Sequence, residues 1–83
     1  MKVIFRRQED QALFCLIVSE AGYDPKRKEL WFQGYGDRNF SEAIIRNIDL
    51  KEAEKILWMF FNQQSLDLTH MYPAEIIPGS FED

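Results

Sequence analysis

The spacing of apolar residues along the chain changes at Asp49. Before this residue, apolar side chains occur in short runs bounded by turn residues, which is typical of β-strands. From 49 to 62 they repeat at the spacing of an amphipathic helix. Asp49 and Glu52 also match the Asp-x-x-Glu pattern of a helix-capping box. The pattern therefore predicts a β-sheet followed by one helix.

Four extended segments are predicted before the helix. The apolar run Ala12 to Val18 shows no alternation, which favours a central strand covered on both faces. A helix over 8–21 that ends at Gly22 is the alternative for this run. For the last segment the alternative is a short helix that begins at Ser41. The strands are expected at residues 2–7, 12–19, 29–33 (or as far as 35) and 42–48.

Glycine and proline mark the turns between these segments. Gly22 to Lys28 contains an Asp-Pro pair and a charged tip, and is expected to be a turn. Gly34 and Gly36 bracket Tyr35 and are expected to mark a β-bulge or the start of a loop. These positions separate the predicted strands.

The fold class predicted from this order is α+β. We expect an antiparallel meander of three to four strands, with one amphipathic helix packed on one face and an ordered, irregular C-terminal extension. The extension, 63–83, has no clear period but is too apolar for a solvated tail. All 83 residues are expected to form one domain: 1–48 the meander, 49–62 the helix and 63–83 the extension.

The predicted helix has more apolar surface than its contact with a small sheet requires. Trp58 and Met59 project away from its main apolar stripe, among the charged residues. The stripe spans an arc of about 140° on a helical wheel and is expected to pack on the sheet. Its members are Leu50, Ala53, Ile56, Leu57, Phe60 and Phe61.

A single helix covers one face of the sheet, so the other face needs a second cover. Either residues 66–81 fold across it, or another chain does. We expect an intermolecular contact, with a homodimer as the simplest form and an unidentified protein partner as the alternative. The interface candidates are Trp58, Met59, Trp31 and Tyr35, because Trp, Tyr and Met suit protein contacts.

Composition excludes several classes of protein. The single cysteine, Cys15, cannot form an internal disulfide, and its apolar surroundings favour a structural role. The sequence has neither an apolar run long enough to span a membrane nor a recognisable secretory signal. We therefore expect a cytoplasmic protein without membrane contact.

Net charge argues against a dedicated nucleic-acid binder. The chain carries −4 overall, whereas nucleic-acid binding requires positive charge. Residues 1–48 hold eight Lys/Arg and seven Asp/Glu, and residues 49–83 hold two and seven. A small regulator that contacts nucleic acid through basic loops is the alternative function. Its candidate residues are Arg6, Arg7, Lys26, Arg27, Lys28 and Arg38.

Candidate catalytic chemistry is weak. Ser65, Asp67 and His70 are close in sequence, but no nucleophile elbow or oxyanion loop accompanies them. One histidine and one cysteine do not provide a metal-ligand pattern. We expect no catalytic residues, no metal and no cofactor. An enzyme is the second alternative to the preferred function, a non-enzymatic interaction protein that self-associates through apolar surface.

Overall fold

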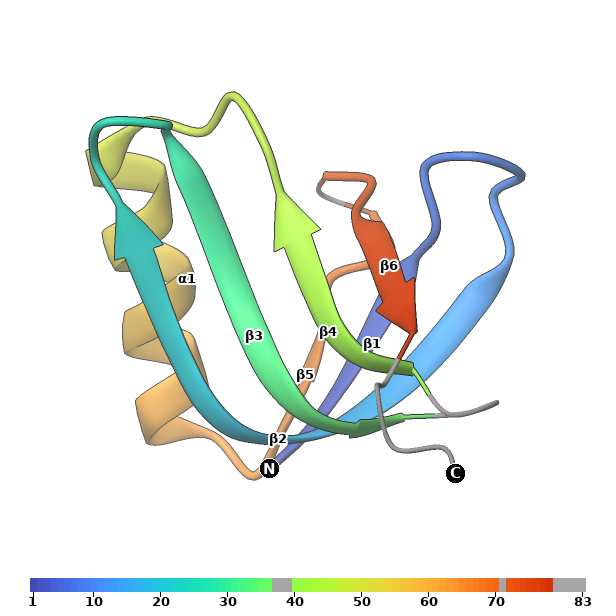
Figure 1. The fold of residues 1–83 in the computed structure, drawn as a ribbon. Helices are drawn as coiled ribbons and strands as arrows, with labels where there is room; N and C mark the ends of the chain where they lie inside the picture. Colours follow the sequence, from blue (N-terminus) through green and yellow to red (C-terminus); the bar gives the residue numbers. More distant parts are fainter. Residues whose placement is uncertain (37–39, 71, 79–83) are drawn as a thin grey trace.

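The computed structural model of the chain describes residues 1–36, 40–70 and 72–78 (Figure 1). These residues form one helix and a set of strands, so the predicted α+β class is confirmed. In chain order the elements are β1 (Lys2–Arg6), β2 (Leu13–Asp24), β3 (Glu29–Gly36), β4 (Phe40–Ile45), α1 (Leu50–Asn62), β5 (Ser65–Asp67) and β6 (Glu75–Pro78).

The strands form one mixed sheet in the order β5-β1-β2-β3-β4-β6. β1 to β4 pair antiparallel with their neighbours in sequence. β5 joins β1 in parallel, and β6 joins β4 antiparallel. The sheet is larger than the three to four strands expected. The segment after the helix, expected to be irregular, supplies both outer strands.

β2 settles the ambiguity of the apolar run, because the residues from Leu13 onward are extended rather than helical. The strand also continues to Asp24, so the predicted turn over 22–28 is too long and the observed turn covers only 25–28. Gly22 stays in the strand opposite Trp31, whose ring lies against it. A Cβ added at Gly22 would be 2.5 Å from Cζ2 of Trp31.

β4 is a strand from Phe40 to Ile45, which excludes the short helix at Ser41. It ends earlier than the predicted 42–48. Asn47 follows it with a φ of 57°, a left-handed conformation that breaks the extended chain. The sheet and the helix are therefore joined by a sharp turn.

A bulge in β2 bends the sheet. The register between β2 and β3 shifts between Val18 and Glu20, and both strands curve strongly at this level (Figure 1). Gly34 lies opposite Val18, and a Cβ there would be only 1.9 Å from the carbonyl oxygen of Ile17. The bulge thus lies in β2, whereas β3, where a bulge or loop was predicted, continues to Gly36.

The C-terminal segment closes the curved sheet on itself. After β5, the chain follows the free edge of β1, where the Leu68 N–H donates to the Ile4 carbonyl at 2.9 Å. Ala74 then donates to Arg6 at 2.9 Å and accepts from the Gln8 N–H at 2.8 Å. From this point β6 leaves β1 and pairs with β4. The segment 65–78 therefore links both sides of a partly closed barrel.

The inner face of this curved sheet holds the core. Phe32 is central, with its ring 5.2 Å from that of Phe5 and 5.9 Å from that of Phe60. Both contacts are edge-to-face, the arrangement that aromatic rings prefer. Strands, helix and C-terminal segment all contribute buried side chains: Val3, Phe5, Leu16, Val18, Leu30, Phe32, Ala43, Ile45, Ile48, Ala53, Ile56, Phe60, Leu66, Leu68 and Ala74.

The helix packs through a narrower stripe than expected. Only Ala53, Ile56 and Phe60 are buried, whereas Leu50 and Phe61, assigned to the same stripe, are exposed. The capping box is also absent. Asp49 occupies the N-cap position without a side-chain cap bond, and the Glu52 carboxylate accepts a hydrogen bond from the Tyr72 hydroxyl at 3.2 Å instead.

In its described residues, 63–70 and 72–78, the C-terminal segment does not cover the outer face of the sheet. Its apolar residues Leu66, Leu68 and Ala74 belong to the inner core. On β2, Leu13 and Ile17 alternate with buried residues, so they point outward and are exposed. The outer face of the described sheet thus keeps apolar surface in contact with solvent.

The turn between β1 and β2 is held by an ion pair. The Arg7 guanidinium donates two hydrogen bonds to the Asp10 carboxylate, at 2.9 and 2.6 Å, and lies 4.5 Å from the centre of the Phe14 ring. The Ala12 N–H donates to the same carboxylate at 3.1 Å. These donors, Arg7 first, lower the pKa of Asp10 from 3.8 to about 2.

The Gly34→Ala substitution should destabilise the protein severely, because its methyl group would overlap the β2 backbone. We expect a loss of at least about 3 kcal/mol in the free energy of unfolding, measured by urea denaturation, or failure to fold. The neighbouring exposed position provides the control, and Gln33→Ala should change stability by no more than about 0.5 kcal/mol. A Gly34→Ala protein as stable as the wild type would show that the bend does not need glycine.

Acid should weaken the β1–β2 turn within a defined pH range. The folded state lowers the pKa of Asp10, so the ionised carboxylate stabilises the fold. This contribution is fully present above pH 3.8 and is lost as the pH falls from 3.8 through about 2. An NMR titration of the Asp10 carboxyl should show a higher midpoint in Arg7→Gln than in the wild type. Arg27→Gln, in the opposite hairpin, should leave it unchanged. The same midpoint in all three proteins would contradict the assignment.

Candidate functional site

The exposed side of α1 carries a second apolar stripe, next to the one that packs on the sheet. At about 100° per residue, Leu50, Leu57, Trp58 and Phe61 fall on one side of the buried residues. Leu57 is half-buried, whereas Leu50, Trp58 and Phe61 are 54%, 64% and 71% exposed. We call these four residues the helix flank.

The helix flank is supported by a buried ring beneath it, by a hydrogen bond just before the helix and by one within its last turn. Beneath it, Phe60 is buried and its ring contacts that of Phe61, with 5.1 Å between ring centres. At the start of the helix, the Tyr23 hydroxyl donates to the Ile48 carbonyl at 2.6 Å. At its end, the Asn62 side chain donates to the Trp58 carbonyl at 2.7 Å. The helix flank is therefore presented by a well-anchored helix.

Charged residues adjoin the helix flank in its N-terminal half. Glu54 lies within the arc of the flank, and Lys51 and Lys55 follow on the side of Trp58. All three side chains are exposed. Within the described part of the chain, none of them has an ion-pair partner. The last turn of α1 contains no basic residue.

The structure places the four predicted interface residues on two different surfaces. Trp58 belongs to the helix flank. Met59, expected to point away from the core, is half-buried and packs against it. Trp31 and Tyr35 lie on the outer face of β3, where they alternate with the buried Leu30 and Phe32. The four residues therefore do not form one patch.

Three members of the helix flank were not identified from the sequence. Leu50, Leu57 and Phe61 were assigned to the sheet contact because they fall within one continuous arc with the buried residues. The width of that arc was the available signal, since a single contact with a small sheet buries a narrower stripe. In the structure, three residues of the arc are buried, and the residues along one side of the arc form the helix flank.

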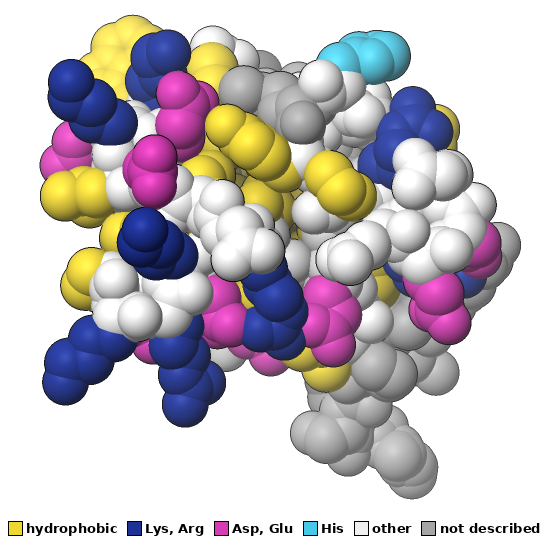
Figure 2. Space-filling model, turned by 90° about the horizontal axis from the view of Figure 1, so that it is seen from above, with side chains coloured by type: hydrophobic (Ala, Val, Ile, Leu, Met, Phe, Trp, Pro, Cys, Tyr) yellow, Lys and Arg dark blue, Asp and Glu magenta, His cyan; other side chains and the backbone are white. Residues whose placement is uncertain are grey.

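The predicted nucleic-acid residues are separated along β2. Arg6 and Arg7 lie at one end of this strand, and the basic tip 26–28 follows its other end. Several of these side chains already have partners: Arg6 donates to the Thr69 carbonyl at 3.0 Å, and Arg7 pairs with Asp10. Figure 2 shows acidic and basic side chains interleaved on one face of the molecule. Arg38 lies outside the described residues.

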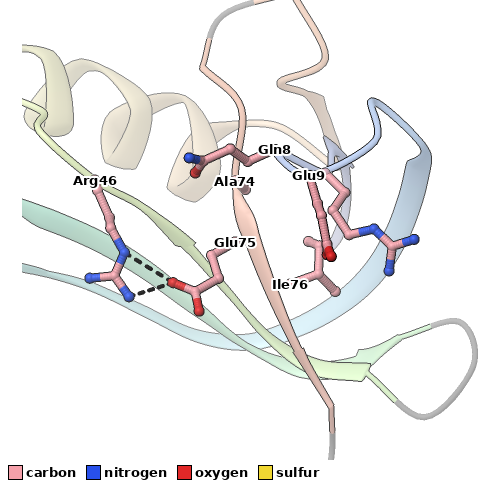
Figure 3. Close-up of a pocket in the computed structure, with 7 residues that line it drawn as sticks. Gln8, Glu9, Arg46, Ala74, Glu75 and Ile76 are labelled. Carbon is pink, nitrogen blue, oxygen red and sulfur yellow. Dashed lines mark hydrogen bonds and ion pairs between the residues drawn. The ribbon is translucent and has the colours of Figure 1, made fainter.

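A pocket of about 370 Å³ lies between β6 and the β1–β2 turn (Figure 3). Arg46 lies at one side of it and pairs with Glu75, at 3.0 Å from Nε, and with Glu29. Glu75 raises the pKa of Arg46 mainly through this hydrogen bond. Five of the seven lining residues are polar or charged, whereas ligand pockets are lined predominantly by apolar side chains. The lining residues are Arg7, Gln8, Glu9, Arg46, Ala74, Glu75 and Ile76.

Within the Ser65, Asp67 and His70 group, the Asp67 side chain is engaged in local structure. Asp67 accepts hydrogen bonds from the backbone and the hydroxyl of Thr69, at 2.9 and 2.6 Å, and these bonds lower its pKa. This arrangement is a turn stabilised by an aspartate side chain. In the described part of the chain, no cluster of His, Cys, Asp and Glu could hold a metal ion.

Among the described residues, no helix is long and apolar enough to cross a membrane. Comparisons with protein-family models, with curated proteins and with solved structures found no match. The candidate site therefore depends on the geometry of this chain, and its most distinctive feature is the helix flank.

Proposed function

We propose that this chain is a non-enzymatic interaction protein that binds another protein surface through the helix flank. One observation carries the proposal: Leu50, Trp58 and Phe61 are each more than half exposed on the same side of one helix. Exposed apolar side chains that lie together on a small protein commonly mark an interface.

The residue types of the helix flank support this function. Aromatic side chains, Trp in particular, are enriched among the few residues that supply most of the binding energy of protein interfaces. Trp58 and Phe61 are separated by three positions, so they are neighbours on the helix surface. A partner can therefore cover both rings in one contact.

The anchoring of α1 also favours binding. Ala53, Ile56 and Phe60 hold the helix against the core, so the flank is ordered before a partner arrives. Binding by a preformed surface loses less conformational entropy than binding by a flexible one. The polar pocket offers less support for catalysis, because Arg7, Arg46 and Glu75 are already paired with one another or with neighbours.

Site-specific photo-crosslinking in the cells that produce the protein tests this function. A photoreactive phenylalanine analogue at Trp58 should form covalent products with a protein that contacts the helix flank. The same analogue at Arg27, an exposed residue in the far hairpin, is the matched control and should give at least about tenfold less product. Each variant is first checked for the wild-type circular dichroism spectrum.

The second part of the test uses a substitution that disrupts the helix flank. Phe61→Asp places a charge on the flank and leaves Ala53, Ile56 and Phe60 themselves unchanged. It should reduce crosslinking from position 58 by about tenfold, as loss of an interface aromatic does. No protein adduct at position 58, or equal adducts at 58 and 27, would contradict the proposed function.

A further inference from the structure

We infer that the partner of the helix flank is a second copy of this chain, with the two α1 helices antiparallel about a twofold axis. The inference rests on the proposed function and names its partner. In a twofold contact the same patch is used on both copies, so the patch must be complementary to itself. The apolar and charged residues of α1 meet this requirement.

The apolar residues are complementary along the helix axis. Leu50 begins the flank and Phe61 ends it, a span of about 16 Å at 1.5 Å per residue. When two copies run antiparallel around the middle of this span, Leu50 of one copy lies level with Phe61 of the other. Each small aliphatic end then faces a large aromatic one, and both Trp58 rings lie near the centre.

The charged residues are complementary in the same arrangement. Glu54 of one copy lies level with Leu57 of the other, about 3 Å along the axis from that copy's Lys55. Glu54 lies within the arc of the flank and Lys55 lies beside it, past Trp58. A twofold axis brings matching sides of the two helices together, so the longer Lys55 side chain lies on the side from which it can reach Glu54 of the other copy. Glu54 and Lys55 have no ion-pair partner among the described residues of their own chain. In the dimer, Glu54 of each copy would pair with Lys55 of the other, so all four residues would gain an ion-pair partner.

The helix ends support the antiparallel direction. The last turn of α1 has no basic residue to offset its partial negative charge. An antiparallel copy places its Lys51 level with Phe60, in that last turn. Parallel helices would instead place like ends of the two dipoles together.

The shape of the molecule favours the helix over the outer face of the sheet. The sheet curves around the core, so its outer face is convex (Figure 1). Two convex sheet faces would touch over a small area only, whereas two packed helices share a longer contact. Leu13 and Ile17 on that face therefore provide a suitable control.

The available area predicts a weak dimer. A fully buried aromatic side chain contributes about 150–250 Å², so the exposed parts of Trp58, Phe61 and Leu50 amount to roughly 300–400 Å² per chain. Two copies bury about twice this apolar area, which is less than the roughly 1,200–2,000 Å² of stable complexes. We therefore expect dissociation in the micromolar range, about 10–100 µM.

The inference is tested by exchanging the charges of Glu54 and Lys55. The dimer dissociation constant is measured by sedimentation velocity at protein concentrations from about 1 to 300 µM. Glu54→Lys and Lys55→Glu each place like charges across the twofold axis, and each should raise the dissociation constant about tenfold. The double variant, Glu54→Lys with Lys55→Glu, restores opposite charges and should return to within about threefold of the wild type. Ile17→Ser, on the outer sheet face, should match the wild type.

Three results would overturn the inference. The first is a wild-type protein that stays monomeric throughout this range. The second is a double variant that is as weak as the single ones, and the third is loss of dimer in Ile17→Ser alone. A monomer whose Trp58 position still crosslinks to a different protein would refute the dimer and leave the proposed function standing. A monomer without any adduct would refute both.

Discussion

The close approach of two backbones at Gly34 is the constraint on which the rest of the architecture depends. The β2 bulge and the missing side chain at Gly34 let β2 and β3 bend together, with the Ile17 carbonyl where a Cβ would otherwise be. A flat sheet of this size would have two open faces, and one helix would cover only one of them. The bent sheet instead encloses its own core. Its inner face is covered by opposing strands, and the chain after α1 completes the closure by pairing with β1 and then with β4.

This closure explains why α1 keeps exposed apolar surface. In a flat two-layer fold, the helix would have to cover the whole width of the sheet, and an apolar arc of about 140° would be buried. Here the segment 65–78 contributes Leu66, Leu68 and Ala74 to the core, so the helix needs only Ala53, Ile56 and Phe60. Leu50 and Phe61 are left outside, beside Trp58. The exposed flank of the helix and the closure of the sheet are therefore two consequences of one packing arrangement.

Local sequence patterns were sufficient to predict β1 to β4 and the helix. The features that were not predicted depend on contacts between residues far apart in sequence. The alternation and apolar runs identified β1 to β4 and the helix, and the position of Trp58 on the exposed side of α1 followed from the wheel. The roles of β5 and β6 depend on hydrogen bonds such as that between Leu68 and Ile4, across 64 positions, and no local pattern encodes such pairing. Met59 was misplaced for a related reason: whether a residue at the border of a helix face is buried depends on what packs beside it.

The distribution of ion pairs separates structural charges from available ones. Arg46 connects Glu29 of β3 with Glu75 of β6, and thus joins segments that are distant in sequence at the point where the sheet closes. Arg7 similarly stabilises its own turn through Asp10. Arg7, Arg46 and Glu75 line the pocket, yet each of them is already paired with an opposite charge. On α1, Glu54 and Lys55 have no such partner among the described residues, although they adjoin the largest exposed aromatic side chains of the helix. Lys51 and Lys55 border the apolar residues of the flank. Apolar surface bordered by charges is the usual composition of a protein interface, whose rim is polar and whose centre is apolar. We therefore propose the helix flank, rather than the pocket, as the binding surface.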